Sequence, residues 1–297
     1  MRKSAFFVSV ILVLAAMSLV PACSRAIPAG PKGHLFIVGG GERDEPLMKR
    51  YVELAGGYGT GRVVIFTMAS SVPLEVGPEL VAEFQKRGVK DVGFYQLSRE
   101  QAMRTDSAKI LDGVSAIWFA GGDQARLTAA LLDTPIHARM LELYAAGCLI
   151  GGTSAGAAVM SEVMITGDEK RTKNEDELWQ TVEAENVVRV RGFGFVKNAV
   201  IDQHFLVRRR QNRLISLVLE NPALIGAGID ESTAILVRPD GKWEVLGESQ
   251  VFVVDARKAV VTKASSNKLG GHGLALHLLL AGDVFDPVEG RAEGPSK

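Results

Sequence analysis

Residues 148–156 read CLIGGTSAG, an apolar run followed by two glycines, a serine and a further glycine. Small residues that favour a helix follow, over 155–164. A strand, a sharp turn with flanking glycines and then a helix form the context that a G-x-S-x-G nucleophile elbow requires. Glycine is needed on both sides of the turn because a Cβ there would clash with the crowded backbone. We therefore expect the Ser154 hydroxyl to project from the end of a sheet, with the Ala155 N–H directed at any oxyanion that forms.

A serine in such a turn needs a base within hydrogen-bond reach and an acid that orients the base. His204 is the best candidate for the base among the five histidines. It ends the strand-like run 199–205 and is followed by a basic helix pattern, 208–220. The point where a strand meets a helix in an open α/β sheet is the edge at which such folds bind ligands. The other histidines fit surface or packing positions better: His34, His137, His272 and His277.

The segment 228–234 reads GIDESTA and supplies the acid. We predict Glu231 as the residue that orients His204, and Asp230 stays open as its rival. The chain order is then serine, histidine, acid. The α/β-hydrolases place the acid before the histidine, and chymotrypsin and subtilisin use other orders again. The same chemistry is therefore expected here on a separate fold.

Four motifs occur in one order along the chain: GGDQ at 121–124, GTSAGA at 152–157, DQHF at 202–205 with arginines after it, and GIDESTA at 228–234. This series resembles cyanophycinase, a member of a serine peptidase family that also contains aspartyl dipeptidase. The likeness spans roughly 35–255, and four motifs in order are far more specific than any one of them.

The resemblance implies roles for individual residues. The nucleophile of the family would fall on Ser154, its base on His204 and its acid on Glu231. Backbone N–H groups near Gly122 and Ala155 would form the oxyanion hole. Polar and charged side chains would line the substrate pocket: Gln124, Asp202, Gln203, Arg208, Arg210 and Arg213. Family members of the cyanophycinase type cut a poly-aspartate backbone that carries arginine on each side-chain carboxyl, and they release β-Asp-Arg dipeptides.

Arginine forks suit the carboxylates of such a substrate, and an acid such as Asp202 suits its guanidinium groups. On a helix Arg213 would share a face with Arg209 and Arg210, whereas Arg208 and Arg210 would not share one. We therefore expect Arg208 to precede the helix if the arginines converge on the substrate. A solvated basic helix start is the alternative, because runs of charge are usually no more than that.

The 297 residues carry no net formal charge, and 47% of them are hydrophobic. This composition suits a globular protein with a substantial core and offers no electrostatic case for nucleic acid binding. Glycines follow apolar runs without forming G-x-G-x-x-G or a Walker A loop, so a nucleotide cofactor is not expected. Because Cys23 and Cys148 are the two cysteines and no Cys/His cluster has ligand spacing, we expect neither a disulfide framework nor a metal.

Residues 1–22 have the pattern of an export signal of the lipoprotein type. Two basic residues precede an unbroken apolar stretch, 5–20, and residues 20–23 read VPAC, similar to a bacterial lipobox with Cys23 as the lipidated residue. Pro21 is uncommon there, which leaves plain signal cleavage at the same place open, and a retained membrane anchor ranks third. We expect an exported bacterial protein, either lipid-anchored in a membrane or secreted.

Beyond the leader, residues 23–33 suit a tether, 34–286 a single α/β domain and 287–297 a flexible tail. The polar, charged loop 167–185 inside the domain is either a lid over the substrate or a disordered excursion.

Short runs rich in Val and Ile alternate with helix patterns in the domain. This predicts a mostly parallel sheet flanked by helices, flavodoxin-like or similar to class-I glutamine amidotransferases. Two of the patterns, 99–111 and 125–144, each indicate one helix. After residue 225 the pattern changes to paired strands with a turn signal at 239–242. The sheet should therefore end in an antiparallel extension on its C-terminal side.

Three alternatives remain. An aspartyl or isoaspartyl dipeptidase would share the three catalytic residues but prefer short free peptides. A non-catalytic lipoprotein would keep the pocket and deliver peptides for uptake. A glutamine amidotransferase would carry cysteine at the elbow, and Ser154 argues against it. The sequence also leaves a homodimer open.

Overall fold

The computed structural model describes residues 30–57, 61–171 and 180–295. The predicted export signal at 1–22, the lipidation site Cys23 and the tether up to residue 29 lie outside this part, as do the central residues of the predicted loop 167–185. In the described part of the chain, no helix is long and apolar enough to span a membrane.

The core of the fold is a parallel sheet, as the alternating pattern predicted. Its strands are β1 (Leu35–Val38), β2 (Arg62–Phe66), β3 (Asp91–Tyr95), β4 (Ala116–Phe119) and β5 (Leu149–Thr153). They lie in the order β1-β5-β4-β2-β3, with each neighbouring pair parallel. Apart from β3, these strands are almost entirely buried, which explains their near-continuous apolar sequences.

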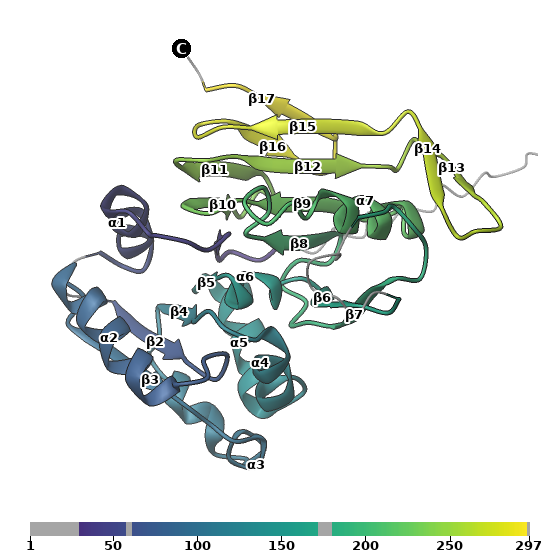
Figure 1. The fold of residues 1–297 in the computed structure, drawn as a ribbon. Helices are drawn as coiled ribbons and strands as arrows, with labels where there is room; N and C mark the ends of the chain where they lie inside the picture. Colours follow the sequence, from purple (N-terminus) through teal and green to yellow (C-terminus); the bar gives the residue numbers. More distant parts are fainter. Residues whose placement is uncertain (1–29, 58–60, 172–179, 296–297) are drawn as a thin grey trace, which may run out of the picture.

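Helices cover both faces of this sheet (Figure 1). Along β4, Trp118 belongs to one apolar cluster and Phe119 to the other, because successive strand residues point to opposite faces. The cluster around Trp118 includes residues of α1 (Glu45–Leu54) and α2 (Pro73–Lys86). The cluster around Phe119 includes residues of α4 (Gln124–Leu131) and α5 (Pro135–Ala146).

Two expected helices are divided. The pattern 125–144 forms α4 and α5, because Asp133 adopts a positive φ of 59° and Thr134 caps a new helix that starts at Pro135. The pattern 99–111 forms a short α3 (Arg99–Ala102) and a 3₁₀ segment, η1 (Ser107–Leu111). A proline at the first helical position is a start signal, so the break at Pro135 was readable from the sequence.

The predicted antiparallel extension is present. Strand β10 (Thr233–Val237) pairs antiparallel with β1, and β11 (Trp243–Gly247), β16 (Val284–Asp286) and β17 (Arg291–Glu293) continue the sheet to nine strands. Residues 287–297 were predicted as a flexible tail, and that prediction is wrong for β17. This strand hydrogen-bonds to β16 as the exposed edge of the sheet, and edge strands need little apolar sequence.

A second sheet, which the sequence analysis did not separate from the first, completes the domain. Its strands are β8 (Ala199–Gln203), β9 (Ile225–Ile229), β12 (Val251–Asp255) and β15 (Ala275–Leu279). Strand β8 pairs parallel with β9, whereas β12 pairs antiparallel with both β9 and β15. One face packs into the cluster around Phe119, and the other carries helix α7 (Gln211–Glu220). Two hairpins flank it: β6 (Val163–Glu169) with β7 (Val187–Arg191), and β13 (Val260–Lys263) with β14 (Leu269–His272).

Candidate active site

Ser154, His204 and Glu231 meet at the carboxyl ends of three strands. Ser154 follows β5, His204 follows β8, and Glu231 lies in the turn between β9 and β10. The loop after β1 joins them. The carbonyl of Val38 accepts the Ser154 N–H at 3.0 Å, and the carbonyl of Gly39 accepts the His204 N–H at 2.7 Å. The next carbonyl accepts the N–H of the residue after Glu231 at 2.9 Å, so three consecutive residues hold all three segments.

The three side chains form one hydrogen-bonded chain. His204 Nε2 lies 2.9 Å from Ser154 Oγ, and His204 Nδ1 lies 2.5 Å from Glu231 Oε1. An ionised carboxylate only accepts hydrogen bonds, so Nδ1 carries the imidazole proton and donates it to Glu231. Nε2 is then free to accept the hydrogen bond of the serine hydroxyl. This is the connectivity of a nucleophile, a base and an orienting acid.

Asp230, the rival acid, has other partners. Its Oδ1 accepts the backbone N–H groups of Leu206 and Val207, at 3.0 and 3.1 Å, and its Oδ2 accepts the Ser249 hydroxyl at 2.8 Å. These bonds fasten the segment directly after His204 to the β9–β10 turn. The carboxylate that contacts the imidazole is therefore that of Glu231.

The backbone is strained where the chemistry would occur. Ser154 has φ 54° and ψ −111°, and His204 has φ 47°. Non-glycine residues seldom adopt such angles, and they persist where the surroundings hold them in place. At the elbow, a Cβ on Gly152 would meet the Gly156 carbonyl oxygen at 2.5 Å, and one on Gly156 would meet the Phe119 carbonyl oxygen at 2.2 Å. Both flanking glycines are therefore required, as the motif indicated.

The predicted oxyanion-hole segments lie against the serine. A Cβ placed on Gly121 would be 3.5 Å from the Ser154 Cβ, so the 121–122 turn passes beside the nucleophile. Gly122 has φ 135°, and a Cβ there would meet the Ala69 carbonyl oxygen at 2.1 Å. Ala155 is fully buried and begins the short helix α6 (Ala155–Ala158), which ends well before residue 164, the end of the predicted helix.

The six predicted substrate-binding residues have different surroundings. Asp202 and Arg213 are at most 2% exposed and form a bidentate pair, with Arg213 Nε donating to Asp202 Oδ2 at 2.7 Å. Gln124 is buried and donates to the carbonyls of Ile165 and Thr166 at 2.9 and 2.7 Å. Each of these three side chains is engaged inside the protein, and that they line the substrate pocket stays a prediction.

The remaining three predicted residues are Gln203, which directly precedes the histidine, and two arginines that follow it. Arg208 is exposed and precedes α7, which begins at Gln211, as expected if it faces a ligand. Arg210 donates from Nη1 to the backbone carbonyl of Gln203 at 2.6 Å and to its side-chain oxygen at 2.9 Å. Burial lowers the pKa of Arg210 to about 10, with a further contribution from nearby Arg213, so this guanidinium stays charged at neutral pH.

The pKa of His204 is lowered from its ordinary value. The main cause is desolvation by burial, and the positive charges of Arg208 and Arg210 act in the same direction. The hydrogen bond and the charge of Glu231 act against it. A lowered pKa keeps the imidazole neutral near pH 7, which is the form that accepts a proton from serine.

The amino-acid sequence matches a known protein family. The sequence model that defines peptidase family S51 matches residues 35–245, and this range includes Ser154, His204 and Glu231. This protein belongs to peptidase family S51. It is therefore a serine-type peptidase with an α/β fold.

Several curated relatives of this S51 peptidase carry the name cyanophycinase. The protein from Geminocystis herdmanii is 32% identical over 264 residues, covering 86% of this chain and 94% of the relative. The protein from Trichormus variabilis is also 32% identical, over 267 residues and 87% of each chain. Among solved structures, a peptidase from an acI-B1 actinobacterium superposes with a TM-score of 0.63 at 24% identity, covering 86% of this chain and 98% of that one. That likeness shows the shared fold.

The S51 peptidase has a cavity of about 330 Å³ beside Ser154. Its walls come from the loop after β1, from Ala120 and Gly121, and from one face of α2. The charged residues on these walls are Arg43, Glu79 and Glu83. Sequence reasoning missed all three, although a charged run, 42–45, follows the three glycines after the first strand.

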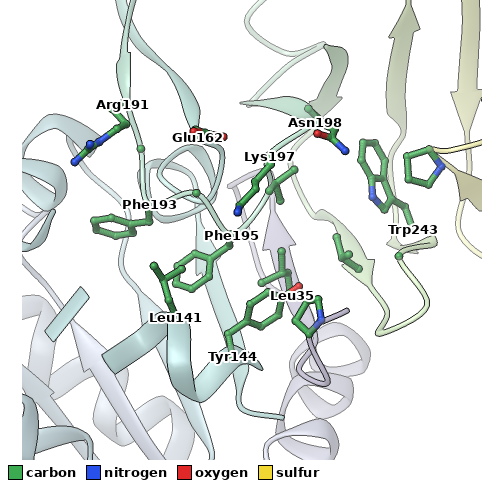
Figure 2. A pocket seen from close by; sticks show the side chains of 18 of the residues that line it. Leu35, Leu141, Tyr144, Glu162, Arg191, Phe193, Phe195, Lys197, Asn198 and Trp243 are labelled. Carbon is green, nitrogen blue, oxygen red and sulfur yellow. The ribbon is translucent and has the colours of Figure 1, made fainter. Parts of the chain in front are cut away.

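A larger cavity, of about 950 Å³, lies at the opposite edge of the sheets. It is lined by the first residues of β1 and β11, Leu35 and Trp243, whereas Ser154 follows the last residue of β5. Figure 2 shows Phe193, Phe195 and Tyr144 grouped on one side of it and Trp243 on another. The distance from the serine along the strands separates this cavity from the site of chemistry. Among the described residues, no group of three or more His, Cys, Asp or Glu side chains could hold a metal ion.

Proposed function

We propose that this S51 peptidase hydrolyses cyanophycin-type polymer to β-Asp-Arg dipeptides, with Ser154 as nucleophile, His204 as base and Glu231 as the orienting acid. The observation that carries the chemistry is the position of His204 between the other two side chains, at 2.9 and 2.5 Å. The substrate class rests on the relatives named cyanophycinase, which match the chain along most of its length.

In the acylation step, Ser154 Oγ attacks the scissile carbonyl carbon while His204 Nε2 takes the hydroxyl proton. The carbonyl π electrons move onto oxygen, and N–H groups of Gly122 and Ala155 stabilise this oxyanion. Glu231 stabilises the imidazolium that forms. When the C–N bond breaks, His204 returns the proton to the leaving amine and an acyl-enzyme remains. The same imidazole then takes a proton from water, whose oxygen attacks the ester carbon. The C–Oγ bond breaks, His204 returns the proton to Ser154 Oγ, and the acyl product leaves.

Charge complementarity supports the substrate assignment. Arg208 and Arg210 follow the base within a few residues and present guanidinium groups to the carboxylates of the substrate. Arg210 is positioned through Gln203, which precedes His204. The buried pair of Asp202 and Arg213 positions this segment from behind, by fixing β8 to α7. Asp202 and Arg213 are therefore positioning residues in this proposal.

We also propose that the protein is exported and attached to a membrane through lipid on Cys23. The support is the leader pattern, two basic residues followed by the apolar run 5–20 and VPAC at 20–23. The test is the precursor-to-mature size shift in a bacterial host with and without globomycin, which inhibits lipoprotein signal peptidase. Lipoprotein processing predicts a globomycin-sensitive shift that Cys23→Ala lacks, whereas a globomycin-insensitive shift shared by both proteins would indicate plain signal cleavage.

The proposed activity is tested by incubating the purified full-length protein with cyanophycin and identifying the products by mass spectrometry, with Ser154→Ala alongside. Release of β-Asp-Arg by the wild type alone is the expected result. Cleavage of short aspartyl peptides without release from the polymer would indicate the dipeptidase alternative. Tight peptide binding with no cleavage of either substrate would indicate the non-catalytic binding protein.

A further inference from the structure

The cavity between Ser154 and α2 has a charged wall that the proposed reaction does not yet use. A polymer bound across the nucleophile needs a site on each side of the scissile bond. Arg208 and Arg210 lie on the β8–α7 side of the serine, next to His204. The 330 Å³ cavity is bounded by the loop after β1 and by α2, and neither Arg208 nor Arg210 lines it.

One face of α2 forms the wall of this cavity. Val76, Glu79, Leu80 and Glu83 line it, and their spacing of three and four residues places them on one side of the helix. Leu80 is buried in the core, whereas Glu79 is exposed. Among the described residues, Glu79 makes no hydrogen bond or ion pair, so its carboxylate is available to a cation in the cavity.

Arg43 supplies the opposite charge. Its Nη2 donates to Glu83 Oε2 at 2.8 Å, and the Glu83 carboxylate is shared with Arg87 at 3.2 Å. This pairing fixes the position of the Arg43 guanidinium at the cavity wall. Its Nε atom is buried and has no hydrogen-bond partner among the residues that the structure describes. The Arg43 side chain as a whole lines the cavity and is 21% exposed, so its guanidinium group is accessible to a carboxylate on a bound molecule.

We propose that Arg43 and Glu79 form a binding site for one dipeptide unit of the substrate, on the far side of the scissile bond from Arg208. The occupant is a zwitterion that carries a carboxylate and a guanidinium. Arg43 binds the carboxylate, and Glu79 binds the guanidinium. The inference rests on the proposed function for the identity of the zwitterion, and it identifies specificity residues on α2 and the β1 loop.

The test uses the dimer (β-Asp-Arg)₂ and two analogues in which one arginine is replaced by citrulline, its neutral isostere. Glu79 is exposed, so the wild type should prefer arginine over citrulline at the unit in the cavity by about threefold in kcat/KM. Glu79→Gln should abolish the preference for arginine at the unit in the cavity. It should leave any discrimination between arginine and citrulline at the other unit unchanged. Glu75→Gln, on the same helix but lining another depression, is the matched control and should behave as wild type.

Arg43 is half-buried and its contact with the substrate is charge-assisted, so Arg43→Gln should raise KM by about tenfold or more, with a smaller change in kcat. Arg50→Gln, which removes an arginine paired at 3.8 Å on the exposed surface of α1, serves as its control. Thermal melting of both arginine variants identifies any loss of folding. The comparison of Glu79→Gln with Glu75→Gln does not depend on the folding of the arginine variants.

Calorimetric binding of the three dimers to Ser154→Ala, alone and combined with Glu79→Gln, measures the site without turnover. Binding that responds to Glu79→Gln supports the site even if the wild type cleaves none of the dimers, in which case the proposed hydrolysis alone fails. Citrulline discrimination that is unchanged by Glu79→Gln at both units, in binding and in turnover, would overturn the site while leaving the hydrolysis intact.

Discussion

The Nε2 atom of His204 lies 2.9 Å from the Oγ atom of Ser154, although 50 positions in the chain separate the two residues. The serine directly follows a strand of the nine-stranded sheet, and the histidine directly follows a strand of the four-stranded sheet. The loop after β1 bridges the gap, because consecutive carbonyls of Val38 and Gly39 accept the two backbone N–H groups. The geometry of the site therefore depends on a segment that contributes none of the three hydrogen-bonded side chains.

Gly40→Ala should impair catalysis through that loop. A Cβ at residue 40 would lie 2.3 Å from the Cε1 atom of His204, so the imidazole must move. A displacement near 1 Å at a reacting group can lower the rate by about 100-fold, and we expect a loss of that order in kcat. Gly113→Ala is the control, because Gly113 also has a positive φ, 71°, but a Cβ there meets nothing within 4 Å. Equal losses of kcat in the two variants would show that backbone strain at a glycine of positive φ, and not displacement of the imidazole, lowers the rate.

Glu231 and Asp230 should separate into a catalytic and a structural acid. Glu231→Gln removes the charge that fixes the imidazole, and we expect kcat to fall by roughly 10⁴-fold with little change in melting temperature. Asp230→Ala leaves the N–H groups of Leu206 and Val207 without their acceptor. It should lower the free energy of unfolding by about 1–3 kcal/mol. Steady-state kinetics and urea unfolding of both variants check this, and near-wild-type activity of Glu231→Gln would refute the assignment.

The pH–rate profile should report the lowered pKa of His204. The neutral imidazole is the active form, so kcat/KM should be constant above that pKa and fall as the pH drops through it, below the ordinary value of 6.5. Arg208→Gln removes a positive charge that disfavours the imidazolium, so the pKa should rise and the acid limb should move to higher pH. A shift to lower pH, or none, would argue against a close approach of Arg208 to the base.

The buried pair of Asp202 and Arg213 should matter for stability. Asp202→Ala leaves a buried guanidinium without its carboxylate, and breaking such a pair costs about 3–5 kcal/mol in free energy of unfolding. Asp240→Ala, which breaks the exposed pair with Arg238, should cost less than about 1 kcal/mol. Denaturant unfolding compares the two. If Asp202→Ala keeps wild-type stability and raises KM instead, Asp202 binds substrate directly.

The parts of the site that follow local rules were predictable from the sequence. The elbow could be located because two glycines are sterically required around Ser154, and His204 because it ends a strand. The helix pattern was expected over 208–220, whereas α7 begins at Gln211; a start after Arg208 was expected only if the arginines converge on the substrate. The division of one predicted helix at Thr134 and Pro135 was also marked locally, by a cap residue and a proline, and was overlooked.

The parts that depend on distant contacts were not predictable. A sequence cannot tell whether Asp202 and Arg213, eleven residues apart, will pair with each other or face a ligand, because both outcomes use the same charges. Nor does it reveal that β12 leaves β11 to pair with β9 in another sheet. The cavity wall formed by Arg43 and Glu79 was likewise not predictable, because it exists only where α2 packs beside the loop after β1.

In the proposed mechanism Ser154 is the nucleophile, and His204 and Glu231 activate it. The most direct test of this mechanism is to treat the folded full-length protein with a fluorophosphonate and to map the modified residue by tandem mass spectrometry, with His204→Gln alongside. We expect one adduct, on Ser154, whose rate of formation falls steeply in His204→Gln. An adduct on another residue, or none on the folded wild type, would contradict this mechanism.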